Sequence, residues 1–209
     1  MDDSIMGNYK VDRKISMSGD FERTQDSVMF EPDLENPANV RIKNSANALI
    51  NTDTYRKIEG GEAYSGTCTR FTCDVFQSAN IPFPDTNSAA LVYDLLSGRR
   101  TDPKTKKNWR RDYQPVTDYK DIKSGDLIFF HGEGISELHT AVATSDWYNP
   151  NMLESFLYDS GVQVVHDKGE STAVSNEFKS EGFMNRKERK RDGTQEEMFR
   201  IAFRYVGDE

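Results

Sequence analysis

The 209-residue sequence contains few cysteines, no long apolar run and no excess of basic residues. No stretch approaches the roughly 18 apolar residues that a membrane-spanning helix needs, so we expect no membrane span. The first six residues have neither a basic region nor an apolar core, so we expect no secretory signal peptide and synthesis in the cytoplasm. The net charge of −8 differs from the basic footprint of nucleic-acid binders, so we expect no nucleic-acid partner.

The two cysteines, Cys68 and Cys73, are too few for a disulfide framework. If both lie on one helix, five residues separate them by about 140° around its axis. A disulfide between them is then geometrically implausible, and two unpaired thiols fit a reducing compartment of synthesis. Neither cysteine belongs to a CxxC or HExxH pattern. The sequence therefore predicts no metal site and no cofactor.

The chain is expected to have a polar N-terminal extension at residues 1–36 and one domain at residues 37–209. Apolar residues at helical spacing predict a weak helix at 39–52, an amphipathic helix at 68–79 and a short helix at 88–96. The two stronger helices have recognisable ends. Thr67 is the expected N-cap of the first and Asn87 of the second, and Gly98 follows the last helical residue.

The second half of the sequence predicts strands. Short apolar or alternating segments lie at 126–130, 139–144, 155–158, 162–165 and 199–205. In the last of these, Phe199, Ile201, Phe203 and Tyr205 alternate with Arg200, Ala202 and Arg204. The stretch from 167 to 197 is polar and carries no predicted strand. Helices followed by a run of strands predict an α+β fold with an antiparallel sheet.

Two stretches are strongly basic despite the acidic total. One covers residues 99–111, within an insertion at about 97–119, and the other covers residues 186–191. One interpretation is that both are solvated loops. The other is that they contact an anionic polymer or partner.

Cys68 and His139 are the residues best suited to chemistry. A thiolate is a far better nucleophile than a thiol, and a helix N-terminus lowers the ordinary cysteine pKa of about 8.5. Cys68 opens the predicted helix at 68–79 and belongs to its apolar face. His139 opens a predicted strand and shares one face with Ala141 and Ala143, which we expect to meet that helix. This arrangement suits a Cys–His dyad, although a buried cysteine and a structural histidine are the commoner roles of such residues.

The other chemistry-bearing residues have more ordinary expected roles. Cys73 is expected to be buried and inert, and His166 to be exposed to solvent. Asp126 is expected to make a hydrogen bond at a turn or strand edge. His131 is the reserve candidate for the general base.

Three motifs raise the dyad above a suspicion, because together they resemble the NlpC/P60 family of papain-like cysteine peptidases. Cys68-Thr69-Arg70-Phe71-Thr72, followed by Ile81 and Pro84, resembles the family's nucleophile motif. Ser124-Gly125-Asp126-Leu127-Ile128-Phe129-Phe130 and His139-Thr140-Ala141-Val142-Ala143 resemble its next two strands, in the family's order. The resemblance covers about residues 40–165. It departs from the family pattern at Thr67, where Asp is usual, and at Arg70, where Gly is usual.

The resemblance implies a papain-like fold, in which a helix bearing Cys68 packs on an antiparallel sheet that carries His139. It also implies a third polar residue on the strand after His139, usually His, Asn or Gln in the family. The aligned residue here is Glu154, whose carboxylate would orient the imidazole, although it is equally an ordinary surface residue. Tyr64 resembles the family tyrosine at the oxyanion site, with core packing as the alternative.

The activity implied by the resemblance is hydrolysis of an amide in the stem peptides of bacterial peptidoglycan, without a cofactor. Delivery to the periplasm or cell wall would then be non-classical, as for a phage lysis enzyme or an antibacterial effector. An injected effector implies a secretion-machine component and an immunity protein as partners. The alternatives are a toxin or transferase that uses the same dyad on a protein or lipid amide, and a catalytically dead binding module.

Overall fold

The computed structural model describes residues 37–50, 68–131, 138–148, 160–167, 174–189 and 192–207. The predicted extension at residues 1–36 and the predicted strand at 155–158 lie outside these ranges. The first helices are α1 (Pro37–Leu49), α2 (Cys68–Ser78) and α3 (Ala89–Leu96). They match the three predicted helices, except that α1 begins before residue 39 and the N-cap of α3 is Ser88 instead of Asn87. The Ser88 hydroxyl accepts from the Leu91 N–H at 3.2 Å.

The remaining elements follow the segment 97–108. They are, in chain order, η1 (Trp109–Arg111), β1 (Tyr113–Val116), η2 (Tyr119–Asp121), β2 (Leu127–His131), β3 (Leu138–Ala143), β4 (Gly161–Asp167), β5 (Val174–Ser180), α4 (Glu181–Met184), β6 (Lys187–Arg189), β7 (Gln195–Glu197) and β8 (Phe199–Tyr205). The polar stretch 167–197 therefore does contain strands, which the sequence pattern did not predict. Their charged side chains hide the alternation on which a strand prediction depends.

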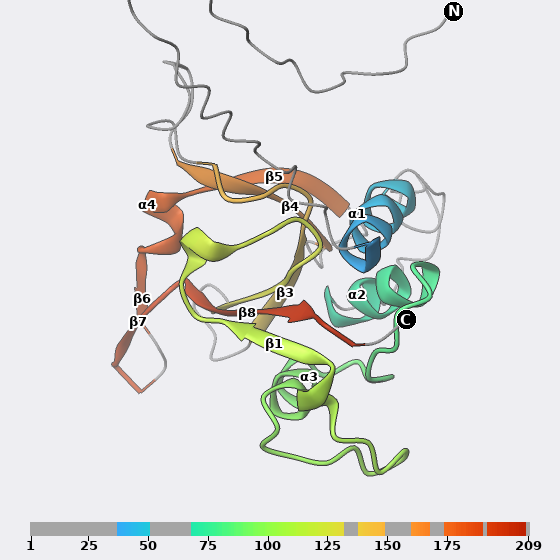
Figure 1. The fold of residues 1–209 in the computed structure, drawn as a ribbon. Coiled ribbons are helices and arrows are strands. Elements are labelled where there is room, and N and C mark those ends of the chain that lie inside the picture. The colour runs from blue at the N-terminus through green and yellow to red at the C-terminus, as the bar shows by residue number, and fades with distance from the viewer. Residues whose placement is uncertain are drawn as a thin grey trace, which may run out of the picture. The chain divides into compact units, whose positions relative to one another are not determined.

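Six strands form one sheet in the order β1-β8-β2-β3-β4-β5, and every neighbouring pair is antiparallel. In Figure 1, α1 and α2 lie beside each other on one side of this sheet, and α4 lies on the other side with the β6–β7 hairpin. The fold is thus α+β with an antiparallel sheet, as predicted. No helix in the described ranges combines the length and apolarity that would let it cross a membrane.

Each face of the sheet carries its own apolar cluster, which is why the strands are apolar on both sides. Leu127, Phe129, Val142 and Val165 pack with the helices α1, α2 and α3. A second cluster on the opposite face contains Ile128, Phe130, Ala141, Ala143, Val162, Val164 and Met184. The prediction that the face of Ala141 and Ala143 meets the cysteine-bearing helix is therefore wrong. Alternation assigns the residues of a strand to two faces. Because both faces of this sheet are covered, alternation does not decide which of them packs against a given helix.

A bulge in β8 breaks the alternation predicted for the last strand. Phe129 pairs with Ile201, whereas Phe130 pairs with Phe199, so one extra residue of β8 lies between the two pairs. Phe199 consequently joins the second cluster, while Ile201 and Phe203 pack with the first. A bulge of this kind shifts every side chain beyond it to the other face.

The Ser124-Gly125-Asp126 motif connects the sheet to α1. Gly125 has φ of +87°, and a Cβ there would lie 2.7 Å from the backbone of Asn39. Asp126 is fully buried and accepts from the Arg204 guanidinium at 2.8 and 2.9 Å and from the Lys123 N–H at 2.8 Å. This confirms the hydrogen-bonding role expected of Asp126.

The basic stretch at 99–111 is not simply a solvated loop. Trp109 is buried, and its indole N–H donates to Asp102 at 3.1 Å. The segment continues into β1, where Tyr113 is fully buried and donates to the Pro82 carbonyl at 2.6 Å. The insertion thus supplies an edge strand and part of the core, while most of its Lys and Arg side chains face solvent.

Candidate active site

Cys68 is the first residue of α2 and is partly exposed. The helix forms because Phe71, Val75 and Phe76 recur on one face and are fully buried against the sheet. The first N–H groups of a helix have no partner within it and favour a negative charge. The Cys68 sulfur is therefore held where a thiolate is stabilised and solvent still has access.

Two buried threonines fix this end of α2 to β3. The Thr72 hydroxyl donates to the Cys68 carbonyl at 3.0 Å, and it lies 3.1 Å from the Thr140 hydroxyl. Both side chains are fully buried. The pair therefore sets the position of Cys68 relative to His139, the residue before Thr140.

The thiol of Cys68 contacts β3 directly. Burial by itself raises the pKa of Cys68, but hydrogen bonding to His139, the positive charge of that imidazole and hydrogen bonds from Thr140 outweigh it. The result is a pKa lowered to about 7. A substantial part of Cys68 is then thiolate at neutral pH, as nucleophilic catalysis by cysteine requires.

His166 on β4 lies against the far side of the His139 ring. His139 Nε2 and His166 Nδ1 are 2.7 Å apart, and the two rings meet edge to face at 4.8 Å between centroids. With Nε2 engaged by His166, the remaining ring nitrogen of His139 is the one that serves Cys68.

The prediction that His166 is exposed is wrong, since its exposure is only 7%. The reason is β5, which the sequence pattern did not reveal: His166 pairs with Ser175 of β5 in the sheet register. Burial lowers the pKa of His166, and the neighbouring charges of His139 and Lys179 lower it further, to about 4, against the opposing effect of Glu177. His166 is therefore neutral at neutral pH and suited to accept a hydrogen bond from a protonated His139.

A carboxylate completes this chain of contacts. Glu177 Oε2 on β5 lies 3.4 Å from His166 Nε2 and 2.6 Å from Lys179 Nζ. The described residues thus form a continuous path from Cys68 through His139 and His166 to Glu177. Sequence patterns identified the first two members but not the last two, nor the threonine pair.

Glu154, Tyr64 and Thr67 lie outside the described residues, so their suggested roles stay predictions. The place next to His139 that the resemblance assigns to a third polar residue is held by His166. The family's preference for a histidine on the next strand was the signal that could have identified His166.

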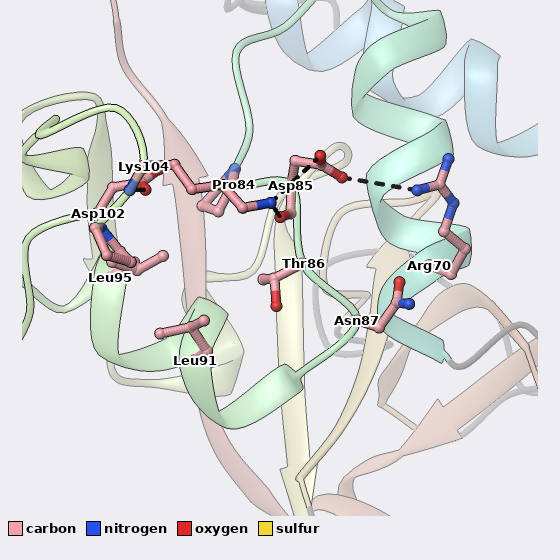
Figure 2. A pocket seen from close by; sticks show the side chains of 10 residues that line it. Arg70, Pro84, Asp85, Thr86, Asn87, Leu91, Leu95, Asp102 and Lys104 are labelled. Carbon is pink, nitrogen blue, oxygen red and sulfur yellow. Dashed lines mark hydrogen bonds and ion pairs between the residues drawn. The ribbon is translucent and has the colours of Figure 1, made fainter.

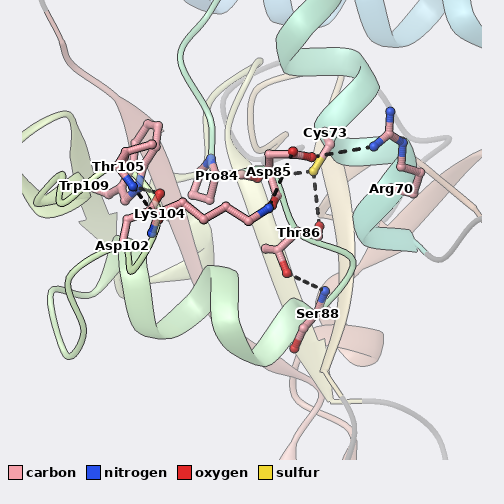
Figure 3. Close-up of polar contacts among 10 residues, drawn as sticks. All are labelled: Arg70, Cys73, Pro84, Asp85, Thr86, Ser88, Asp102, Lys104, Thr105 and Trp109. Carbon is pink, nitrogen blue, oxygen red and sulfur yellow. Dashed lines mark hydrogen bonds and ion pairs between the residues drawn. The ribbon is translucent and has the colours of Figure 1, made fainter.

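His131 and Cys73 lie apart from this path. His131 Nε2 contacts Glu196 Oε2 at 2.7 Å on β7. The Cys73 thiol is buried, as predicted, and donates to the carbonyls of Pro84 and Thr86 at 3.4 Å each. Burial raises the pKa of Cys73. Figure 3 shows this thiol next to Asp85 and Thr86.

A pocket of about 340 Å³ opens on the flank of α2. Figure 2 shows Arg70 on one rim and Lys104 on the other, with the Asp85 carboxylate between them. Arg70 lies 3.7 Å from Asp85 and 2.9 Å from Asp74, and Lys104 lies 3.9 Å from Asp85. Neither Cys68 nor His139 lines this pocket, so it is separate from the Cys68–His139 contact.

The described residues contain no group of three or more His, Cys, Asp or Glu side chains positioned to hold a metal ion. Comparisons with family models, with curated proteins and with solved structures found no match for this chain.

Proposed function

We propose that this protein is a cysteine hydrolase that cleaves an amide bond through a thioacyl intermediate on Cys68. The observation that carries the proposal is a partly exposed thiol with a pKa lowered to about 7, next to His139, whose other nitrogen contacts a buried neutral histidine. A merely structural cysteine has no need of such a partner. Cys73 on the same helix illustrates the contrast, because its thiol is buried and its pKa is raised.

The first half of the reaction is acylation. The Cys68 thiolate attacks the carbonyl carbon, and the C–N bond breaks as protonated His139 gives its proton to the departing amine. The product is a thioester on Cys68. The N–H groups at the start of α2 are the natural donors to the developing oxyanion, since they lack helical partners.

The second half is hydrolysis of the thioester. Neutral His139 takes a proton from water as the water oxygen attacks the thioester carbonyl. The C–S bond then breaks, releasing the acid and restoring the thiolate and the protonated imidazole. His166 Nδ1 accepts from His139 Nε2 throughout and holds the imidazole in place.

For the substrate we propose the stem peptide of bacterial peptidoglycan, on the strength of the NlpC/P60 resemblance. Stem peptides carry free carboxylates, and Arg and Lys side chains are suited to them. The pocket brings Arg70 of α2 and Lys104 of the basic stretch to one place, where a substrate carboxylate would compete with Asp85 for both side chains. Lys107 does not line this pocket, and it pairs with Asp112 and lies over the Trp109 ring.

The deciding experiment is incubation of the protein with purified muropeptides, with products identified by mass. Cleavage by the wild type and none by Cys68→Ala is the expected result. If a folded protein with a reactive Cys68 cleaves no muropeptide, the substrate assignment is wrong, and a toxin or transferase acting on a protein or lipid amide becomes the better reading. An unreactive Cys68 would favour a binding module.

The contribution of charge can be tested separately. Exposed ion pairs are screened over about 8 Å at physiological ionic strength, so KM should rise with salt if the pocket binds a carboxylate. Arg70→Gln with Lys104→Gln should raise KM, leave kcat nearly unchanged and remove the salt dependence. Lys106→Gln is the matched control, because Lys106 is exposed, donates to the Pro103 carbonyl and does not line the pocket. A KM independent of salt in the wild type would contradict the charge argument.

A further inference from the structure

We infer that Glu177 is a positioning residue that selects the tautomer of His166 and thereby sets the proton arrangement of the Cys68–His139 pair. This inference rests on the proposed function and adds a fourth residue to Cys68, His139 and His166. Glu177 reaches the site from β5, the edge strand of the sheet.

The contact between the two histidines does not by itself decide which of the two facing nitrogens carries the proton. His139 Nε2 and His166 Nδ1 are 2.7 Å apart, so only one of these two nitrogens carries the proton between them. If the proton belongs to His166 Nδ1, His139 cannot be protonated on both nitrogens without opposing two N–H groups. If it belongs to His139 Nε2, His139 is free to become the cation that a Cys68 thiolate needs.

Glu177 decides between these arrangements. A neutral imidazole carries one N–H, and Glu177 Oε2 lies 3.4 Å from His166 Nε2. A carboxylate only accepts, so it favours the tautomer with the proton on Nε2 and leaves Nδ1 of His166 as the acceptor for His139. The ion pair with Lys179 Nζ, at 2.6 Å, holds the carboxylate oxygen in this position.

The charged and titratable groups around His166, among the described residues, come from two strands. They are His139 on β3 and Glu177 and Lys179 on β5. Cys68 on α2 acts on His139 rather than on His166. Removing the Glu177 carboxylate takes away the acceptor and leaves the Lys179 ammonium near His166. Both changes make a protonated His139, and therefore a Cys68 thiolate, less favourable.

The test is the pH dependence of iodoacetamide labelling at Cys68, followed by peptide mass, which needs no substrate. We expect Glu177→Ala to shift the inflection upward by about one pH unit, which lowers labelling below the inflection about tenfold. Glu177→Gln keeps an acceptor oxygen and should restore most of the labelling.

Glu181→Ala is the matched control for loss of a carboxylate. Glu181 follows β5, accepts from Tyr119 and pairs with Lys120, away from the histidines, so the inflection should not move. A wild-type inflection near 7 that Glu177→Ala leaves unchanged would overturn this inference while the dyad stands. Equal shifts in the Ala and Gln variants would overturn the tautomer argument. A wild-type inflection near that of an ordinary thiol would instead overturn the proposed function.

Discussion

At the scale of single residues, α2 holds two cysteines with opposite environments. Cys68 is partly exposed and lies against His139 and Thr140, which lower its pKa to about 7. Cys73, five residues later, is buried and donates to two backbone carbonyls, and burial raises its pKa. Reactivity follows the thiolate fraction and access, so the two thiols should differ strongly.

We predict that iodoacetamide at pH 7 labels Cys68 and leaves Cys73 of the folded protein unmodified. Labelling followed by peptide mass measures both sites in one sample. Cys68→Ala should abolish hydrolysis and Cys73→Ala should retain most of it, with both variants folded. Preferential labelling of Cys73 would show that the nucleophile has been wrongly assigned.

His139 and His166 should contribute unequally to the rate. A general base contributes about 10²–10⁴-fold, and His139→Ala should lower kcat by a factor in this range. His166 acts only through His139, so His166→Ala should cost less. His166→Gln should recover part of the loss, because its amide oxygen still accepts from His139 Nε2. Paired kinetics of the three variants decide the matter, and near-wild-type turnover in His139→Ala would move the base elsewhere, with His131 as the reserve candidate.

At the scale of elements, the site depends on how α2 is joined to β3. The hydroxyls of Thr72 on α2 and Thr140 on β3 lie 3.1 Å apart, although the two residues are 68 positions apart in the sequence. Helix and strand patterns do not specify such a contact, because threonine is ordinary in both. The pair nevertheless fixes which turn of α2 faces His139.

We predict that Thr72→Val and Thr140→Val each destabilise the fold by about 1–3 kcal/mol, since each removes the hydrogen bond between the two buried hydroxyls. The double variant should cost less than the sum of the two, because this shared hydrogen bond is lost only once. Urea unfolding of the four proteins gives the coupling energy. Thr140→Ser, which keeps the hydroxyl, is the control, and strict additivity would contradict a direct interaction.

At the scale of the whole molecule, the sheet is covered on both faces and its edge strand β5 buries His166. The pKa of His166 is lowered from its ordinary value of 6.5 to about 4. The unfolded chain therefore takes up a proton near pH 6.5, whereas the folded protein does so only near pH 4. Because the unfolded state binds more protons in this window, stability must fall as the pH falls through it.

The predicted contribution of His166 is a loss of about 3 kcal/mol of unfolding free energy between pH 6.5 and pH 4, with no further loss from this residue below pH 4. His166→Gln should remove this part of the slope. Urea unfolding at several pH values measures both proteins, and the carboxylates that also titrate cancel in the difference. His131→Gln should keep the contribution of His166. Parallel slopes for the wild type and His166→Gln would contradict the buried, neutral assignment.

The sequence by itself determined the elements whose patterns are local. The apolar face of Phe71, Val75 and Phe76 predicted α2, and the short apolar runs predicted β2, β3 and β4. Gly98 lies just beyond α3 with φ of +76°, and a glycine at this position is a direct sequence signal for a helix end. The same local patterns were enough to predict an α+β fold and to select Cys68 and His139 as the candidate dyad.

Only the tertiary structure decided what lies around that dyad. Glu177 and His166 meet because β5 pairs with β4, and β5 is too polar to be recognised from its own residues. The orientation of β3 and the bulge in β8 depend on which side chains face each of the two apolar clusters. Periodicity alone does not decide this, because both faces of the sheet are buried. Burial and the charge of each imidazole are properties of the assembled sheet, so the sequence predicted the nucleophile and base but not the groups that hold them in place.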